Sequence, residues 1–217
     1  VRKFEKMVGC VERRHARNLT TRDLARDSAA ALREKGLWSA DDVDACLFVS
    51  QTHDYAFPAT ACALHGDLGL RPGCLAYDMR MGCSAFVYAL TQAAALVQSG
   101  ACRRILIMGG DCLSHVCAED DASNRMLFGD AGFAAVVEQS EDDRGMFCRL
   151  GTSGRDAQAI YAGWGGHARR LNGLEIKDPW LHMDGLAVFK FTSTVIPAEI
   201  KAFCAASNQD IASFDTF

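Results

Sequence analysis

The cysteine at position 83 lies where a reactive thiol is expected. Cys83 follows an expected strand, Cys74–Met79, and precedes Ser84–Ser99, a segment so apolar that it predicts a buried helix. The N-terminus of a helix carries partial positive charge and free N–H groups, which stabilise a thiolate and could hold the oxyanion formed on a thioester carbonyl. Cys83 is therefore a candidate nucleophile. The alternative interpretation is one more buried cysteine at a strand–helix junction.

The sequence contains ten cysteines, and the others have a plainer interpretation. Most lie beside apolar residues, as Cys46 and Cys204 do, which is typical of small buried hydrophobic side chains. Cys-x-x-Cys pairs do not occur, and Val1–Lys6 is charged and lacks the apolar core of a signal peptide. We therefore expect free thiols in a reducing compartment, the cytoplasm.

Cys112, His115 and Cys117 are close enough in sequence to suggest a metal site. Structural zinc takes four well-spaced ligands, and a fourth has no obvious source here. The sequence therefore predicts that the protein holds no metal, with a zinc site as the less favoured alternative.

The elements that must position Cys83 alternate between strand and helix. A capping box at Thr20–Asp23 predicts a helix that ends at Gly36, and Pro58 suits the first turn of another that ends at Gly69. The expected strands are Ala45–Ser50, Cys74–Met79, Arg104–Met108, Ala134–Glu138 and Met146–Leu150. This order predicts a layered α/β fold with a largely buried mixed sheet.

The last third of the sequence has a different pattern. Gly151–Trp180 lacks periodicity and predicts a long irregular connection. A helix is expected from about Gly185 to Ala206, with a kink or break at Pro197. Ile211–Phe217 is expected to begin a further strand.

The overall composition excludes several classes of protein. The 217 residues carry a net charge of −4, so the broad basic surface of a nucleic-acid-binding protein is not expected. Hydrophobic residues make up 49% of the sequence, which argues against disorder. Apolar runs such as Ala93–Val97 are far shorter than the ~20 residues of a membrane-spanning helix.

Five short segments of the sequence together resemble one known family. Asp78–Leu90, which surrounds Cys83, closely resembles the active-site stretch of the β-ketoacyl-acyl-carrier-protein synthase III family, in which Ala-Cys-Ser-Gly-Phe is followed by Tyr-Ala-Leu. Similar segments occur in the family's order at Gly9–His15, Ala56–Ala59, Phe128–Gly132 and His182–Phe191. Ordered matches over nearly the whole chain are far more specific than any single motif.

The resemblance implies the thiolase-like fold, an α/β layered fold with two related α/β halves, usually assembled as a homodimer. Residues 1–140 would form the N-terminal half, which bears the nucleophile. Residues 141–217 would begin the C-terminal half, which is incomplete in this sequence.

The resemblance also implies an activity. Cys83 would take an acyl group from a coenzyme A or acyl-carrier-protein thioester, and a malonyl-carrier carbanion formed by decarboxylation would then attack it. Phe57 matches a residue that reaches toward the acyl pocket of the partner subunit. Met183, Gly185 and Phe189 match positions near the pantetheine channel, although Met183 and Phe189 fit ordinary packing equally well. These thioesters are substrates, and no separate cofactor is expected.

Departures from the family pattern keep other interpretations open. The resemblance implies a later histidine, in a His-Gln-Ala-Asn-like run, and a later asparagine, and none of the six histidines matches the first. We therefore expect a sequence cut short at both ends. The alternatives are an acyltransferase of the same fold that does not decarboxylate, and a catalytically inactive partner subunit.

Overall fold

The computed structural model describes residues 5–6, 8–141 and 145–215. Most of Val1–Lys6, on which the expected lack of a signal peptide rests, lies outside these residues. The chain divides into two compact units, Val1–Asp143 and Arg144–Phe217. Compactness does not test whether the units are related halves of one fold, so the expected halves, 1–140 and 141–217, stay a prediction.

The first unit alternates strands and helices in the predicted order. Its elements are α2 (Thr21–Glu34), β1 (Ala45–Val49), α3 (Thr60–Asp67), β2 (Leu75–Met79), α4 (Ala85–Gln98), β3 (Arg104–Cys112), the 3₁₀ turn η1 (Leu113–His115), α5 (Ala122–Leu127) and β4 (Asp130–Glu138). The strands form one sheet in the order β2-β1-β3-β4. β1 pairs in parallel with β2 and β3, whereas β4 is antiparallel to β3. The predicted layered α/β fold with a mixed sheet is confirmed.

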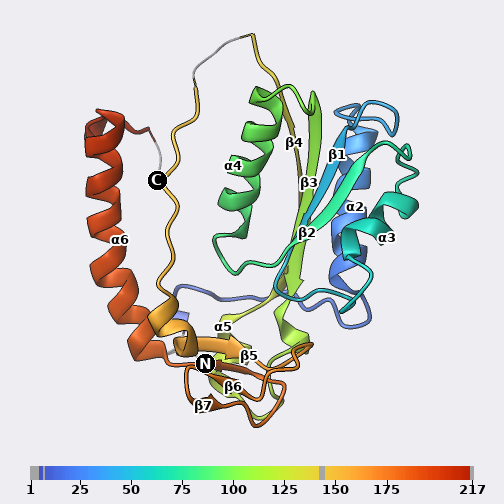
Figure 1. Cartoon of the computed structure of the whole chain (residues 1–217). Coiled ribbons are helices and arrows are strands. Elements are labelled where there is room, and N and C mark those ends of the chain that lie inside the picture. Colours follow the sequence, from blue (N-terminus) through green and yellow to red (C-terminus); the bar gives the residue numbers. More distant parts are fainter. Residues whose placement is uncertain (1–4, 7, 142–144, 216–217) are drawn as a thin grey trace. The chain divides into compact units, whose positions relative to one another are not determined.

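Helices cover both faces of this sheet, α2 and α3 on one side and α4 on the other (Figure 1). Strand side chains alternate between the two faces, so Cys46 and Phe48 pack under α2 and α3, while Ala45, Leu47 and Val49 pack under α4. β1 is buried along its whole length. This explains why its sequence is a continuous apolar run instead of an alternating one.

The Phe128–Gly132 motif joins the start of the chain to the sheet. Asp130 accepts hydrogen bonds from the backbone amides of Ala16 (2.7 Å) and Ser114 (2.9 Å). A Cβ atom at Gly132 would lie only 2.6 Å from the backbone carbonyl of Leu24 in α2. Glycine is therefore what allows α2 to pack directly on β4.

The second unit consists of short strands and one long helix. Its elements are the 3₁₀ segment η2 (Gly154–Ala159), β5 (Ile160–Ala162), β6 (Arg170–Leu171), β7 (Leu174–Glu175), β8 (Leu181–Met183), α6 (Gly185–Ser207) and η3 (Ile211–Ser213). β5 pairs with β8, and β6 with β7. Every residue of α6 is at least partly exposed. In the described parts of the chain, no helix reaches the length and apolarity that crossing a bilayer requires.

Several expectations for the second unit are wrong. Met146–Leu150 is not a strand, because the residues around it offer no strand for it to pair with in the described chain. Ile211–Phe217 begins with the 3₁₀ turn Ile211–Ser213, and its last residues, 216–217, lie outside the described chain. The expected irregular connection, Gly151–Trp180, contains η2, β5 and the β6–β7 hairpin.

Pro197 does not break α6, which runs unbroken through it. Proline removes one backbone hydrogen bond and leaves a carbonyl free one turn earlier. The helix surface around Pro197 is exposed, so water can hydrogen-bond to that carbonyl. The predicted end of the helix near Ala206 is correct, since Asn208 stops it in a left-handed conformation (φ 54°).

Candidate active site

Cys83 lies in an exposed turn immediately before α4. Ser84 is the N-cap residue of that helix, and the Ala85 amide donates a 2.8 Å hydrogen bond to the Gly82 carbonyl, which tightens the turn. α4 is anchored in the core through Ala85, Ala89 and Ala93. The predicted arrangement, a thiol at the N-terminus of a packed helix, is therefore the one observed, and in the first unit taken by itself Cys83 is not a buried cysteine.

A carboxylate holds the loop next to this turn. Asp111, near the end of β3, accepts hydrogen bonds from Ser50 Oγ (2.9 Å) and from the backbone amides of Gln51 (2.9 Å) and Thr52 (3.1 Å). The Gln51 side-chain amide donates to the other Asp111 oxygen at 3.2 Å. A Cβ atom at Gly82 would lie 3.5 Å from Gln51 Oε1, an ordinary contact. Asp111 thus fixes a loop that adjoins the Cys83 turn, and alanine would fit at Gly82.

A second carboxylate acts as a helix cap from a distance. Asp78, on β2, accepts hydrogen bonds from the backbone amides of Thr60 (2.8 Å) and Ala61 (2.7 Å), the first residues of α3. Ala59, the N-cap residue, has only a methyl side chain and cannot cap the helix itself. The motif residue five positions before Cys83 therefore ties β2 to α3.

Sequence reasoning did not single out Asp111 or the capping role of Asp78. The sequence carries one weak signal for each, because an aspartate at the end of an apolar strand is poorly suited to the core and requires a partner. Their partners lie 17 to 61 residues away, so the pairing itself is visible only in the structure.

The remaining cysteines differ from Cys83 in exposure. Five of them, Cys46, Cys74, Cys102, Cys112 and Cys117, are buried, and among the others Cys62 is also exposed. Burial raises the pKa of the Cys102 and Cys117 thiols, and that of Cys112 to about 11. These three thiols stay protonated near neutral pH and are poor nucleophiles.

The predicted substrate-binding residues fall into both units. Phe57 is 87% exposed on the loop between β1 and α3. Met183 is the half-buried last residue of β8, Gly185 is the first residue of α6, and Phe189 is 67% exposed one turn further along. The core-packing alternative for Phe189 is therefore wrong for the second unit taken by itself. The substrate roles of these residues remain predictions.

The residues considered for a metal site have other contacts. Cys112 Sγ lies 3.9 Å from the Leu19 carbonyl oxygen, and His115 Nε2 lies 3.0 Å from the carbonyl oxygen of Arg17. Nowhere in the described residues do three or more His, Cys, Asp or Glu side chains gather as a metal site would require. The zinc alternative thus has no support from the geometry.

Comparison with known sequences agrees with the motifs around Cys83. A family model described as 3-oxoacyl-[acyl-carrier-protein (ACP)] synthase III matches residues 77–154. A beta-ketoacyl-[acyl-carrier-protein] synthase III of Bordetella petrii is 34% identical over 94% of this chain. A protein of the same name from Aliivibrio fischeri is 33% identical over 81% of it. The aligned residues amount to 62% and 53% of the lengths of these curated relatives.

Comparison with solved structures extends the similarity to the whole chain. The crystal structure of a 3-oxoacyl-(acyl-carrier-protein) synthase III matches all of this chain and 68% of its own length, with a TM-score of 0.89 and 32% identity. A 3-oxoacyl-(acyl-carrier protein) synthase from Burkholderia xenovorans LB400 matches with a TM-score of 0.87 and 33% identity, over all of this chain and 64% of its own. The fold is thus thiolase-like, and the chain belongs to the 3-oxoacyl-[acyl-carrier-protein] synthase III family.

Proposed function

We propose that this protein is a condensing acyltransferase of fatty acid or related biosynthesis that works through an acyl-enzyme on Cys83. The observation that carries the proposal is the exposed Cys83 thiol at the N-terminus of a helix packed in the core, in a chain of this family. A thiolate suits such chemistry because it both attacks a thioester and leaves readily.

The proposed reaction has two steps. In the first, Cys83 sulfur attacks the carbonyl of an acyl thioester, the original carbon–sulfur bond breaks, and coenzyme A or the carrier thiol leaves with a proton. In the second, a malonyl thioester on acyl carrier protein loses carbon dioxide. The resulting carbanion attacks the acyl-Cys83 carbonyl, which releases the Cys83 thiolate and a 3-oxoacyl product.

Mass spectrometry of the full chain tests the first step. After incubation with acetyl-CoA, we expect Cys83 to gain the mass of one acyl group, and Cys83→Ser to gain nothing. Cys62→Ser is the matched control, because Cys62 is the other exposed cysteine. The proposal fails if the label lies on Cys62, or if the chain takes up no label from any acyl thioester.

The second step separates the proposal from its alternatives. Malonyl-carrier protein added to the acylated chain should release carbon dioxide and yield a 3-oxoacyl product. Transfer of the acyl group without release of carbon dioxide would instead indicate a non-decarboxylating acyltransferase. A Cys83 that never acylates would fit an inactive partner subunit.

We also propose that the protein is a cytoplasmic homodimer that uses its thioester substrates without a separate cofactor. Two observations support the dimer, namely the outer edge of β2, which is the first strand in the sheet order, and the exposed ring of Phe57. The ten free cysteines support a reducing compartment. Acyl carrier protein and acyl-CoA are the proposed partners, on the strength of the family.

A further inference from the structure

The loop between β1 and α3, residues 50–59, holds an aromatic side chain out in solvent. Phe57 in this loop is 87% exposed, more than any other large hydrophobic residue described. Water does not favour an exposed phenyl ring, so hydrophobic burial cannot be what fixes its position. We call residues 50–59 the Phe57 loop, and polar contacts to α2 hold it in place.

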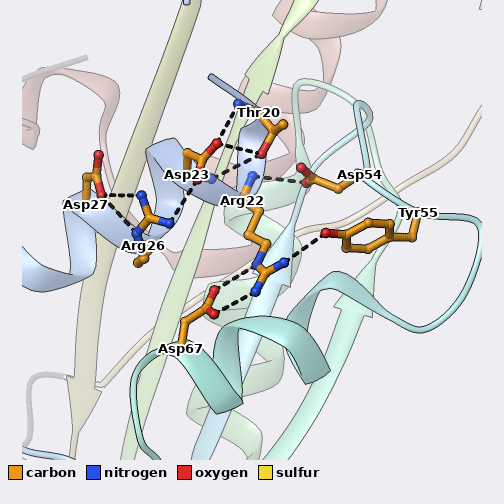
Figure 2. Close-up of polar contacts among 8 residues, drawn as sticks. All are labelled: Thr20, Arg22, Asp23, Arg26, Asp27, Asp54, Tyr55 and Asp67. Carbon is orange, nitrogen blue, oxygen red and sulfur yellow. Dashed lines mark hydrogen bonds and ion pairs between the residues drawn. The ribbon is translucent and has the colours of Figure 1, made fainter. Parts of the chain in front are cut away.

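The side chain of Arg22 connects α2 to α3 and to the Phe57 loop (Figure 2). Arg22, in the first turn of α2, donates two parallel hydrogen bonds to Asp67 at the end of α3, from Nε at 2.7 Å and from Nη2 at 2.6 Å. Its remaining terminal nitrogen, Nη1, donates to the hydroxyl of Tyr55 at 2.8 Å. The planar guanidinium thus spans α3 and the Phe57 loop at the same time.

The backbone around Arg22 holds the same loop. The Arg22 amide donates to Asp54 Oδ2 at 3.0 Å, and Thr21 Oγ1 donates to the Thr52 carbonyl at 2.8 Å. On the far side of Phe57, Asp78 fixes the start of α3, as described above. The loop is therefore held on both sides of Phe57, and Arg22 makes the contacts nearest to it in sequence.

Arg26, one turn further along α2, provides a contrast. It donates to Asp23 at 2.9 Å and to Asp27 at 3.0 Å, both on its own helix (Figure 2). Arg22 and Arg26 carry the same charge on the same helix, but only the contacts of Arg22 reach the Phe57 loop among those drawn there.

We infer that Arg22 is a positioning residue that fixes Phe57 through Tyr55 and Asp54, and thereby sets which acyl chain lengths Cys83 accepts. This inference rests on the proposed function and the proposed homodimer, in which Phe57 would reach toward the acyl pocket of the partner subunit. A side chain that marks the end of a pocket discriminates between chain lengths only if its loop is held still.

Hydrogen exchange of the full chain tests whether Arg22 holds the loop. We expect Arg22→Ala to speed amide exchange at residues 54–57 by about tenfold, since it removes the hydrogen bond to Tyr55, which is worth about that factor, together with the two bonds to Asp67. The backbone hydrogen bond from residue 22 to Asp54 is kept in this variant. Tyr55→Phe removes a single hydroxyl and should give a smaller increase. Arg26→Ala is the matched control and should leave exchange in the loop unchanged.

Acylation of Cys83 tests the consequence for specificity. Rates are measured by mass spectrometry with acetyl-CoA, butyryl-CoA and octanoyl-CoA. We expect the ratio of octanoyl to acetyl rates to change by about tenfold in Arg22→Ala, a factor within the range that one methylene is worth in a pocket. Arg26→Ala should keep the wild-type ratio. Arg22→Lys should behave like Arg22→Ala, because lysine keeps the charge but not the planar fork.

The outcomes separate this inference from the proposed function. Unchanged loop exchange in Arg22→Ala would overturn the inference, as would faster exchange with an unchanged rate ratio, or restoration of the ratio by lysine. If Arg22→Ala does not fold, Tyr55→Phe carries the same comparison. If the wild-type chain accepts none of the three thioesters, the proposed function and the specificity role both fail, while exchange still decides whether Arg22 holds the loop.

Discussion

His53, in the Phe57 loop, is a buried histidine. It is 2% exposed, and its ring lies edge-on to Phe48 with 5.6 Å between the ring centroids. Asp78 Oδ2 is 3.7 Å from His53 Nε2, beyond hydrogen-bond distance, and neither ring nitrogen has a hydrogen-bond partner among the described residues. Burial lowers the pKa of His53 and Arg80 lowers it further, whereas Asp78, Asp111 and Asp54 act in the opposite direction.

The stability of the first unit should therefore fall at acid pH. The unfolded chain binds a proton at His53 below the ordinary histidine pKa of about 6.5, whereas the folded state binds it only at lower pH. The contribution of neutral His53 to the free energy of unfolding is therefore fully present above pH ~6.5 and is lost as the pH falls below it. One such group contributes a slope of at most about 1.4 kcal/mol per pH unit. We expect His53→Leu to flatten the dependence between pH 7 and 5, measured as the free energy of unfolding in urea.

Removal of an exposed histidine controls for the loss of one titratable group. His167 is exposed in the second unit, and His167→Leu should leave the pH dependence of the first unit as in the wild type. Equal slopes for wild type and His53→Leu would show that His53 does not couple folding to pH.

At the scale of single residues, the sequence predicted where Cys83 lies, at the start of a packed helix, but not its surroundings. The position of Cys83 was predictable because the start of a helix depends on neighbours in sequence; its catalytic role stays a prediction. The partners of Arg22, Asp78 and Asp111 lie 17 to 61 residues away, and no local pattern pairs a particular side chain with so distant a partner.

At the scale of elements, Gly132 shows how closely α2 approaches the sheet. A methyl group there would meet the backbone of Leu24, whereas a methyl group at Gly66, in α3, would meet no atom of the described chain within 4 Å. Both glycines lie in regular elements and differ in the space around them.

These two glycines give a matched pair of variants. Gly132→Ala should destabilise the protein by about 1–3 kcal/mol, since the helix backbone must shift. Gly66→Ala should stabilise it by about 0.5–1 kcal/mol, because alanine loses less backbone entropy in a helix. Thermal and urea unfolding of both variants measure these changes. A Gly132→Ala variant as stable as Gly66→Ala would contradict the close packing.

Elements defined by local interactions were predictable, and those defined by partners were not. α2 begins where its capping box indicates, because Thr20 and Asp23 hydrogen-bond to each other within one turn. Met146–Leu150 has the composition of a strand but is none, since a strand exists only where another chain segment pairs with it. The sequence predicted a kink or break at Pro197 because proline removes a backbone hydrogen bond. The helix nevertheless continues, since the exposed surface around Pro197 lets water bind the carbonyl that proline leaves free.

At the scale of the whole molecule, the proposed dimer depends on the edge of β2. Leu75, the first residue of β2, is 49% exposed. In a symmetric pairing of two sheets, each copy would bring the same edge to the contact, so any charge introduced there appears twice.

Leu75→Lys should therefore weaken dimerisation by about tenfold or more, through repulsion across the two-fold axis. Light scattering of the chain at a series of concentrations measures the change. Leu37→Lys is the matched control, because Leu37 is 51% exposed and lies outside the sheet. A Leu75→Lys protein as dimeric as the control would rule out this edge as the contact, and a monomeric wild type would rule out the dimer.

The distribution of thiols over the molecule bears on the design of covalent inhibitors. Of the ten cysteines, the two exposed ones are Cys62 in α3 and Cys83 before α4. A small electrophile would thus meet two principal targets, and selectivity would come from the group that carries the warhead. Hydrogen peroxide would reach the same two sulfurs first. The same two exposed thiols would therefore decide both how readily the protein is oxidised and how readily a covalent inhibitor modifies it.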